Sequence, residues 1–222
     1  MGIDMAKSFA VIGIGRFGTS VAVTLCAMGH EVLAVDVDQT LVNAIADKVT
    51  HAVAADTTDE RALRRMGVDS FDAVVVSTGE NIRVSILTTM LLKELGAKRV
   101  IAKASDELHA KLLEKTGADQ IVLPERDSGV RLARALVLDS VLDYLELTDD
   151  VSINEIRIPK PWVGKSLIEV NVRRVYGVSV VAIRRGETMV VTIDPTAPLL
   201  GEDVLVVLGH NAALQKIAEL GA

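Results

Sequence analysis

The amino-acid sequence predicts an α/β protein in which a doubly wound parallel sheet is followed by a smaller α+β unit. Two observations lead to this class. In the first half, short runs of Val, Ile and Ala alternate with longer amphipathic segments, which is the pattern of parallel strands covered by helices on both faces. After residue 150 the pattern changes to short strands separated by turn residues. With 222 residues, half of them hydrophobic, the chain is long enough for one large or two small domains.

Six strands are expected in the first half, and each of the first five is followed by a helix. The strands are Phe9–Gly13, Val32–Asp36, His51–Ala54, Ala73–Ser77, Arg99–Lys103 and Gln120–Leu123. The helices are Thr19–Met28, Gln39–Lys48, Glu60–Met66, Ile82–Leu95 and Asp106–Thr116. Four of these helices are followed by a glycine, a residue that adopts a left-handed cap without a side-chain clash: Gly29, Gly67, Gly96 and Gly117.

The residues after the sixth strand predict one long helix over Asp127–Leu147. This helix either packs on its own sheet or forms a dimerisation element. From residue 151 we expect strands at Ser152–Ile158, Val178–Arg184, Met189–Ile193 and Val204–Gly209, with helices at Ser166–Asn171 and Ala212–Leu220. We therefore divide the chain into an N-terminal domain at 1–125, a helix and linker at 126–150, and a C-terminal domain at 151–222.

The composition excludes several classes of function. The net charge is -6 and no block of Lys or Arg occurs, so we expect no nucleic-acid partner, because such a partner requires a basic face. Cys26 is the single cysteine, which excludes a disulfide within the chain and a Cys-based zinc site and fits a reducing compartment. No apolar run approaches the roughly 20 residues of a membrane helix, so we expect a partner to supply any membrane role.

The sharpest motif is Gly13-Ile14-Gly15-Arg16-Phe17-Gly18, which follows an apolar strand and opens a helix. Gly13 permits the tight turn, Gly15 lets the backbone approach a phosphate, and Gly18 lets the helix pack closely on the strand. The start of the helix then presents free N–H groups and the positive end of its dipole to an anion. The motif predicts a Rossmann-like nucleotide-binding loop.

Two charged side chains accompany this loop. Asp36 ends the second strand, where a carboxylate accepts hydrogen bonds from a ribose diol and repels a 2′-phosphate. Its alternative role is an ordinary strand-end cap. Arg16 stands between the second and third glycines, where its guanidinium either reaches terminal phosphates or lies solvated at the surface.

Further candidates follow the later strands, at the carboxyl edge where open α/β sheets bind ligands. Lys103 ends the fifth strand and can neutralise a phosphate, and Glu125 follows the sixth and can hold a cation that bridges to it. The alternatives are a surface lysine and a glutamate favoured by a helix dipole. The remaining candidates, each of which is also a typical turn or cap residue, are Asp38, Asp56, Thr57, Ser77, Thr78, Gly79 and Asn81.

Catalytic candidates are few. His30 and His51 are expected at turns, His109 on a charged helix face and His210 after a glycine, all as surface or capping residues. The second unit is short and poor in His, Asp and Glu, whereas a dehydrogenase needs an acid–base group there. We therefore expect nucleotide binding without catalysis.

Several segments of the chain resemble a known family. The run Phe9-Ala10-Val11-Ile12 before the glycine motif, Gly29-His30-Glu31-Val32-Leu33-Ala34-Val35-Asp36, and Leu91-Leu92-Lys93-Glu94-Leu95 resemble the cytoplasmic regulatory subunits of Ktr and Trk potassium transporters. The second unit, with Val163-Gly164-Lys165-Ser166-Leu167 and Asp203-Val204-Leu205-Val206-Val207-Leu208-Gly209, is similar to that family's C-terminal domain. This domain is called the regulator-of-potassium-conductance (RCK) C-terminal domain or TrkA-C domain.

The resemblance implies a regulatory subunit and not an enzyme. Homodimers would assemble into an octameric ring that docks under a membrane potassium channel subunit, on the cytoplasmic face of the cell membrane. The shape of the ring would change when ATP replaces ADP. In this family the glycine loop and the aspartate matching Asp36 hold the nucleotide, the arginine matching Arg16 senses the γ-phosphate across a dimer, and the glutamate matching Glu125 helps to hold Mg²⁺ or another cation.

The resemblance implies two further ligands. Members of the wider family bind NAD(H). Some members bind cyclic di-AMP at the interface between two C-terminal domains, and the positions that match that site here are Leu167, Ile168, Val172, Arg173 and Pro195.

Two rival functions stay open on the sequence. The glycine motif and Asp36 alone would also fit a small NAD-dependent oxidoreductase. A free-standing nucleotide sensor that controls a soluble partner is the second rival.

Overall fold

The computed structural model describes residues 6–78, 81–137, 141–148 and 150–220. It divides into two compact units, Met1–Arg126 and Asp127–Ala222, which are described separately below. Within the described ranges, no helix combines the length and apolar character that crossing a bilayer requires.

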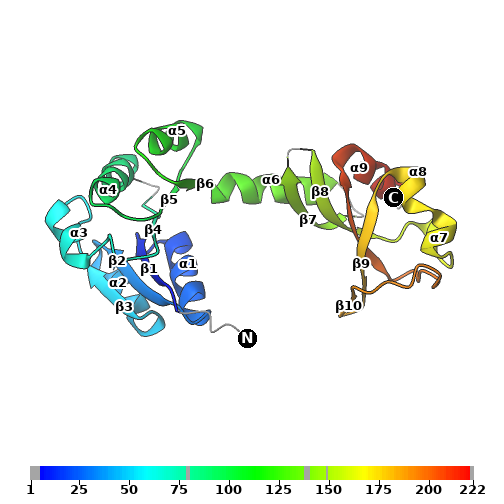
Figure 1. Cartoon of the computed structure of the whole chain (residues 1–222), viewed down its shortest axis with the longest axis horizontal. Coiled ribbons are helices and arrows are strands. Elements are labelled where there is room, and N and C mark those ends of the chain that lie inside the picture. Colours follow the sequence, from blue (N-terminus) through cyan, green and yellow to red (C-terminus); the bar gives the residue numbers. More distant parts are fainter. Residues whose placement is uncertain (1–5, 79–80, 138–140, 149, 221–222) are drawn as a thin grey trace. The chain divides into compact units, whose positions relative to one another are not determined.

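The first unit is built on six parallel strands in the order β3-β2-β1-β4-β5-β6 (Figure 1). The expected strands are confirmed to within one residue at each end: β1 (Ser8–Ile12), β2 (Glu31–Asp36), β3 (His51–Ala54), β4 (Ala73–Val76), β5 (Val100–Lys103) and β6 (Gln120–Val122). The helices are α1 (Arg16–Ala27), α2 (Gln39–Ile45) with the 3₁₀ turn η1 (Ala46–Lys48), α3 (Glu60–Met66), α4 (Ile82–Glu94) and α5 (Glu107–Lys115). Chain order reverses between β1 and β4, which is where such sheets open a ligand crevice.

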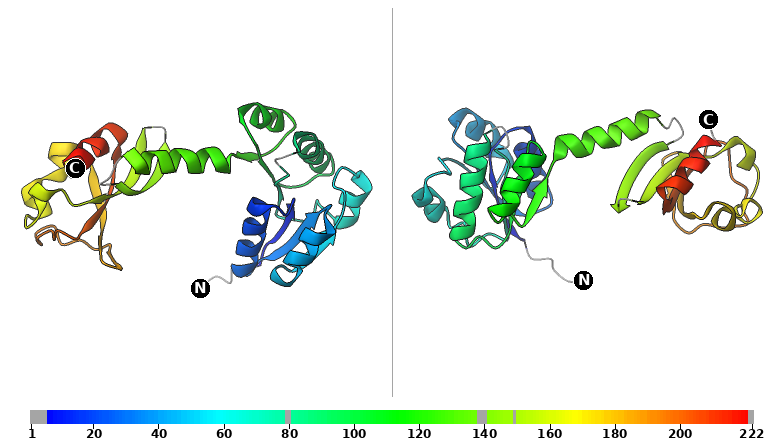
Figure 2. Two further views of the ribbon diagram at one scale, coloured as in Figure 1. Left: turned by 180° about the vertical axis from the view of Figure 1, so that it is seen from behind. Right: turned by 90° about the horizontal axis from the view of Figure 1, so that it is seen from above.

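Helices cover both faces of this sheet, as the sequence predicts (Figure 2). On one face, Val11, Val32 and Ala34 pack with residues of α1 and α2 such as Ala22 and Ile45. On the other face, residues of β1, β2, β4 and β5 pack with Leu63 of α3, Leu91 and Leu92 of α4 and Leu113 of α5. The central strand β4 is consequently buried at all four positions, which explains its unbroken run of Ala and Val.

The glycine caps of the first unit are also confirmed. Gly29, Gly67, Gly96 and Gly117 all have positive φ, between 65° and 98°. Each ends a helix in the left-handed region that costs glycine no steric clash.

The second unit contains a five-stranded antiparallel sheet in the order β10-β9-β11-β8-β7. Its strands are β7 (Val141–Thr148), β8 (Val151–Arg157), β9 (Ser179–Arg185), β10 (Thr188–Val190) and β11 (Val204–His210). The 3₁₀ turn η2 (Lys160–Trp162) and the helices α7 (Leu167–Val170), α8 (Val172–Tyr176) and α9 (Asn211–Glu219) complete it. Ile156, Leu205, Leu214 and Ile217 form the centre of its core, with Trp162 beside them. The predicted α+β class of this unit is thereby confirmed.

The prediction of one helix over Asp127–Leu147 is wrong from Val141 onward, and residues 138–140 of that range lie outside the described residues. Helix α6 (Pro124–Val137) ends early, and β7 follows as a strand that pairs antiparallel with β8. The cause is an ambiguous sequence pattern, because apolar residues four positions apart share one face of a helix and also one face of a strand. Pairing with β8 along most of its length decides in favour of the strand.

The second unit differs from the sequence prediction in two smaller ways. The strand expected at Met189–Ile193 ends at Val190, before the turn residues Asp194 and Pro195. Helix α8 was not expected, and it begins directly after Asn171, whose φ of 51° breaks α7 from α8.

Candidate nucleotide site and a second pocket

The glycine loop between β1 and α1 has the geometry of a phosphate cradle. Gly13 turns the chain with φ of 91°, and Gly15 caps the start of α1. A Cβ atom on Gly18 would overlap the Gly13 carbonyl oxygen, and the hydroxyl of Ser77 donates to that same oxygen at 2.5 Å. A Cβ on Gly15, by contrast, would meet no atom within 4 Å. Gly18 is therefore closely packed against the backbone, while the space next to Gly15 is open for an anion to approach.

Asp36 fixes the loop to the end of β2. Its Oδ2 accepts a hydrogen bond from Ile14 N at 2.6 Å, and its Oδ1 accepts one from Asp38 N at 3.0 Å. Asp36 thus has the capping role that the sequence left as an alternative. Each carboxylate oxygen keeps a second lone pair, so a ribose hydroxyl can still donate to it. Asp38 caps α2 through Thr40 N at 2.7 Å.

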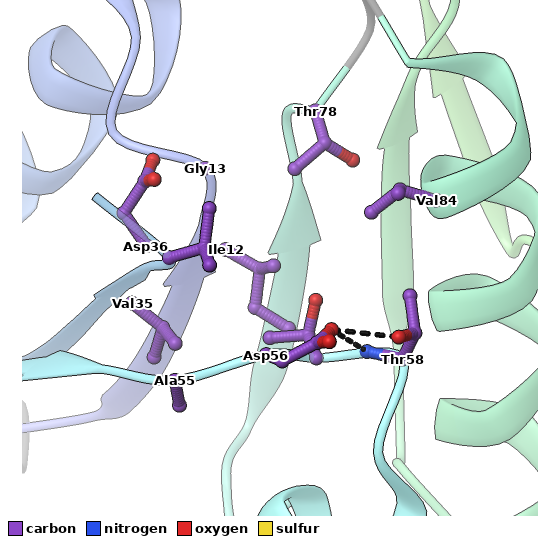
Figure 3. Close-up of a pocket in the computed structure, with 11 residues that line it drawn as sticks. Ile12, Gly13, Val35, Asp36, Ala55, Asp56, Thr58, Thr78 and Val84 are labelled. Carbon is purple, nitrogen blue, oxygen red and sulfur yellow. Dashed lines mark hydrogen bonds between the residues drawn. The ribbon is translucent and has the colours of Figure 1, made fainter.

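A pocket of about 220 Å³ opens beside Gly13 and Asp36 (Figure 3). Its walls come from the ends of β1, β2, β3 and β4 and from the start of α4, and they consist of Ile12, Gly13, Val35, Asp36, Val37, Ala55, Asp56, Thr57, Thr58, Thr78 and Val84. Mostly apolar walls with a few polar groups at the rim are typical of a site for a small ligand.

Polar side chains of the pocket differ in how far they are satisfied. Asp56 Oδ1 accepts from both the backbone N (2.9 Å) and the hydroxyl (2.6 Å) of Thr58, and these bonds lower the pKa of Asp56 below its usual range. Thr57 shares a buried hydrogen bond of 3.0 Å with Thr88. The hydroxyl of Thr78 is buried and has no hydrogen-bond partner among the described residues.

Phe17, Lys103 and Glu125 lie close together, and Arg16 lies near enough for its charge to act on Glu125. Lys103 Nζ lies 2.6 Å from Glu125 Oε1 and 5.9 Å from the centroid of the Phe17 ring. The hydrogen bond from Lys103 is the main cause that lowers the pKa of Glu125, and the charges of Lys103 and Arg16 lower it further. Arg16 and Lys103 thus bring two positive charges near the carboxylate of Glu125, and Lys103 also lies near Phe17 of the glycine motif, where a cation can meet a phosphate group.

The remaining predicted residues lie as follows. Ser77 is engaged with the Gly13 carbonyl, and Asn81 caps α4 by accepting from Val84 N at 3.2 Å. Gly79 lies outside the described residues. No group of three or more His, Cys, Asp or Glu side chains with metal-binding geometry occurs within the described ranges, so Glu125 has no such companions there.

A second pocket, of about 460 Å³, lies in the C-terminal unit. All five positions that the resemblance implies there line it: Leu167, Ile168, Val172, Arg173 and Pro195. Asn171, Val178, Ser179 and Val180 complete its walls. Its floor is apolar, and Arg173 is a cation that can meet an anionic group at the rim.

His109 was misplaced by the sequence prediction. It lies on α5 fully buried, not on an exposed face, and burial lowers its pKa even though the charge of Asp106 acts in the opposite direction. Ser105 N donates to its Nδ1 at 3.2 Å, while its Nε2 has no partner in the described part of the chain. The spacing of four residues from the buried Leu113 was the available signal.

Some pocket residues were also missed by the sequence prediction. Val37, Thr58 and Val84 in the first pocket, and Asn171 and Ser179 in the second, were not among the predicted site residues. Val37 directly follows Asp36 and Thr58 directly follows Thr57, so their position beside predicted residues was the signal.

Comparisons with known proteins match one family to each half of the chain. The TrkA-N domain family matches residues 9–124, and the TrkA-C domain family matches residues 153–220. Ktr system potassium uptake protein C of Bacillus subtilis is 46% identical over 205 residues, covering 92% of this chain and 93% of that protein. Ktr system potassium uptake protein A of the same organism is 42% identical over 221 residues, covering 100% of both chains.

A solved structure of the GsuK channel bound to NAD shares the fold. It superposes with a TM-score of 0.68 over 98% of this chain and 40% of the channel chain, at 18% sequence identity. At 18% sequence identity, this similarity shows a shared fold and nothing about shared ligands.

Proposed function

The chain belongs to the TrkA family of Ktr and Trk potassium-uptake proteins, and we propose that it is the nucleotide-sensing regulatory subunit of a potassium uptake system. The observation that carries the proposal is the open cradle at Gly15, with Arg16 next to it in the chain and Lys103 close to the ring of Phe17. Membership of the family supports a role in potassium uptake. The arrangement at Gly15 supports a nucleotide as the signal that the subunit senses.

The nucleotide in this proposal is ATP or ADP. The backbone N–H groups at the start of α1 hold the phosphates, Asp36 receives the ribose, and the pocket beside Asp56 and Thr78 receives the base. NAD(H) is the alternative occupant of the same cradle. Arg16 and Lys103 favour ATP or ADP, because terminal phosphates carry charge for these cations to neutralise.

Gating follows from differential affinity. A ligand shifts an equilibrium between two shapes of an assembly only if it binds one shape more tightly. A γ-phosphate that Arg16 contacts in one shape supplies such a difference, and ADP lacks it. The assembly in this proposal is a homodimer that builds an octameric ring on the cytoplasmic face of a membrane potassium channel subunit.

Glu125 is the proposed residue for Mg²⁺ or another cation at the nucleotide. A hard cation prefers carboxylate and phosphate oxygens, so Glu125 would complete its ligand shell together with the phosphates. The bound cation supplies positive charge at the phosphates. Lys103, Arg16 and the N terminus of α1 position the phosphates from the protein side.

Cyclic di-AMP is the proposed inhibitor at the second pocket. Support comes from the convergence of Leu167, Ile168, Val172, Arg173 and Pro195 on one cavity, which apolar walls and a single arginine make suitable for a base and a phosphate. A second copy of the C-terminal unit would complete the site.

The proposal is tested with the chain and a Ktr-type membrane subunit reconstituted together in vesicles. Potassium flux should be higher with ATP than with ADP, and the chain should co-purify with the membrane subunit in detergent. Gly15→Ala is the control, because a methyl group there fills the phosphate approach without touching other atoms of the fold. Equal flux with both nucleotides would contradict nucleotide gating, absence of co-purification would favour a soluble sensor, and substrate-dependent NADH turnover would favour an oxidoreductase.

A further inference from the structure

The ion pair between Lys103 and Glu125 joins one largely buried group to one exposed group. Lys103 ends β5, and 15% of its side chain is exposed, whereas Glu125 lies in the first turn of α6 with 66% of its side chain exposed. The ammonium is therefore held at its place by the surrounding fold, while the carboxylate has most of its surface open to solvent. In such a pair the lysine is the fixed partner.

The negative charge of the Glu125 carboxylate is already paired with nearby positive charges. The Lys103 ammonium occupies Oε1 at 2.6 Å, and Arg16 adds a second favourable charge nearby. A metal ion that approaches this carboxylate meets an ammonium at contact distance, and two cations this close repel each other. A metal ion therefore gains full attraction only after the ammonium has moved away.

We propose that Lys103 is a built-in counter-cation of Glu125, which competes with metal ions for this carboxylate and keeps its affinity for them low in the nucleotide-free protein. The displaced ammonium needs another anion because its side chain is mostly buried. Next to the glycine cradle, a phosphate of the bound nucleotide is that anion, and this last step rests on the proposed function. Nucleotide and cation would then each strengthen the binding of the other.

The test measures Mn²⁺ binding to the nucleotide-free full chain by the electron paramagnetic resonance signal of the free ion. Mn²⁺ is chosen because it prefers oxygen ligands and its binding can be followed at millimolar concentration. Lys103→Met removes the ammonium and keeps the length of the apolar stem. We expect it to bind Mn²⁺ about tenfold more tightly than the wild type, since a neighbouring positive charge is lost.

Matched variants locate the effect. Lys103→Arg keeps the charge and should bind Mn²⁺ as weakly as the wild type. Lys103→Met combined with Glu125→Gln should lose the gain. Lys93→Met is the control for removing a lysine elsewhere in the same unit, because Lys93 pairs with Asp119 at 2.9 Å, and it should leave Mn²⁺ binding unchanged. If Lys103→Met does not fold, as judged by circular dichroism, Lys103→Gln replaces it.

Equal or weaker Mn²⁺ binding by the lysine variant would overturn the proposal, as would a gain that survives Glu125→Gln. Calorimetric titration of ADP in EDTA on the same samples separates this result from the proposed function. A chain that shows the Mn²⁺ effect but binds no nucleotide would keep the competition and refute nucleotide sensing, and the reverse combination would refute the competition alone.

Discussion

The two units of this chain differ in how fully their buried polar side chains are hydrogen-bonded. In the C-terminal unit, the buried Ser152, Asn154, Ser166 and Asp203 each take part in a hydrogen bond. In the N-terminal unit, four buried polar atoms have no partner among the residues that the structure describes, namely Thr78 Oγ1, Ser85 Oγ, Thr89 Oγ1 and His109 Nε2.

This difference affects the free energy of unfolding of each unit. An unsatisfied buried polar group costs about 1–3 kcal/mol, so the N-terminal unit carries a cost that its neighbour avoids. Thr78 lies at the wall of the first pocket, and the other three lie on α4 and α5. One of the unpaired groups of the N-terminal unit therefore lies at the candidate site, whereas the four buried polar side chains of the C-terminal unit are hydrogen-bonded.

The largest expected effect concerns the glycine loop, and it sharpens the comparison by separating packing from binding. Gly18→Ala places a methyl group against backbone and should destabilise the N-terminal unit by about 3 kcal/mol. Gly15→Ala should leave the unfolding temperature unchanged but weaken ATP and ADP binding. Thermal unfolding and calorimetry distinguish the two variants, and equal stability losses would contradict the assignment of an open cradle to Gly15.

A smaller effect is expected at Arg16. Arg16→Ala should weaken ATP by about tenfold while changing ADP far less, because a charge-assisted hydrogen bond to the terminal phosphate is worth about 1.5–3 kcal/mol. Calorimetric titration of both nucleotides measures the ratio. The control is Arg83→Ala at the start of α4. Equal losses for ATP and ADP would remove the sensing role from Arg16.

Asp203 tests whether the satisfied network stabilises the C-terminal unit, with an expected loss of about 2 kcal/mol for Asp203→Asn. Burial alone raises the pKa of Asp203. Hydrogen bonds from Arg185 and Leu200 N, together with the charge of Arg185, outweigh burial, so the pKa lies below its ordinary value. A group with a depressed pKa stabilises the fold above its unfolded pKa of about 3.9, and this stabilisation is lost as the pH falls through the folded value.

The deficit of Asp203→Asn relative to the wild type should therefore be full at neutral pH and shrink below about pH 4. Urea unfolding at several pH values measures it, with the neighbouring exposed Glu202→Gln as the control. A deficit that does not depend on pH would show that the charge of Asp203 contributes nothing.

The smallest effect compares one hydroxyl from each unit. Thr89→Val replaces an unpaired buried hydroxyl by a methyl group of the same shape and should change stability by about 0–1 kcal/mol, in the stabilising direction. Ser166→Ala removes the capping box with Glu169 at the start of α7 and should destabilise by about 1 kcal/mol. Thermal unfolding checks both signs, and a destabilising Thr89→Val would break the contrast between the units.

Much of the fold could be predicted because it rests on local patterns. The buried parallel strands, the glycine caps and the loop at Gly13 follow from runs of β-branched residues and from positions that need positive φ. The strand β7 could not be separated from a helix, because its apolar spacing fits both and long-range pairing with β8 decides. The same limit applies to α8, which depends on the left-handed Asn171.

The candidate site divides in a similar way. Residues at strand ends, such as Asp36 and Lys103, could be predicted from topology, because the carboxyl ends of parallel strands share one edge. The contact of Lys103 with Glu125 and the unpaired hydroxyl of Thr78 depend on side-chain placement, which no sequence pattern carries. The burial of His109 was missed because the many charged residues of α5 made its apolar face hard to recognise in the sequence.

Nucleotide sensing is tested most directly by calorimetric titration of ATP, ADP, NADH and cyclic di-AMP into the nucleotide-stripped chain with Mg²⁺ present. We predict tight binding of ATP and ADP and weak binding of NADH, with cyclic di-AMP binding unaffected by Gly15→Ala. Tight binding of NADH together with negligible binding of ATP would contradict the account and return the chain to the redox class.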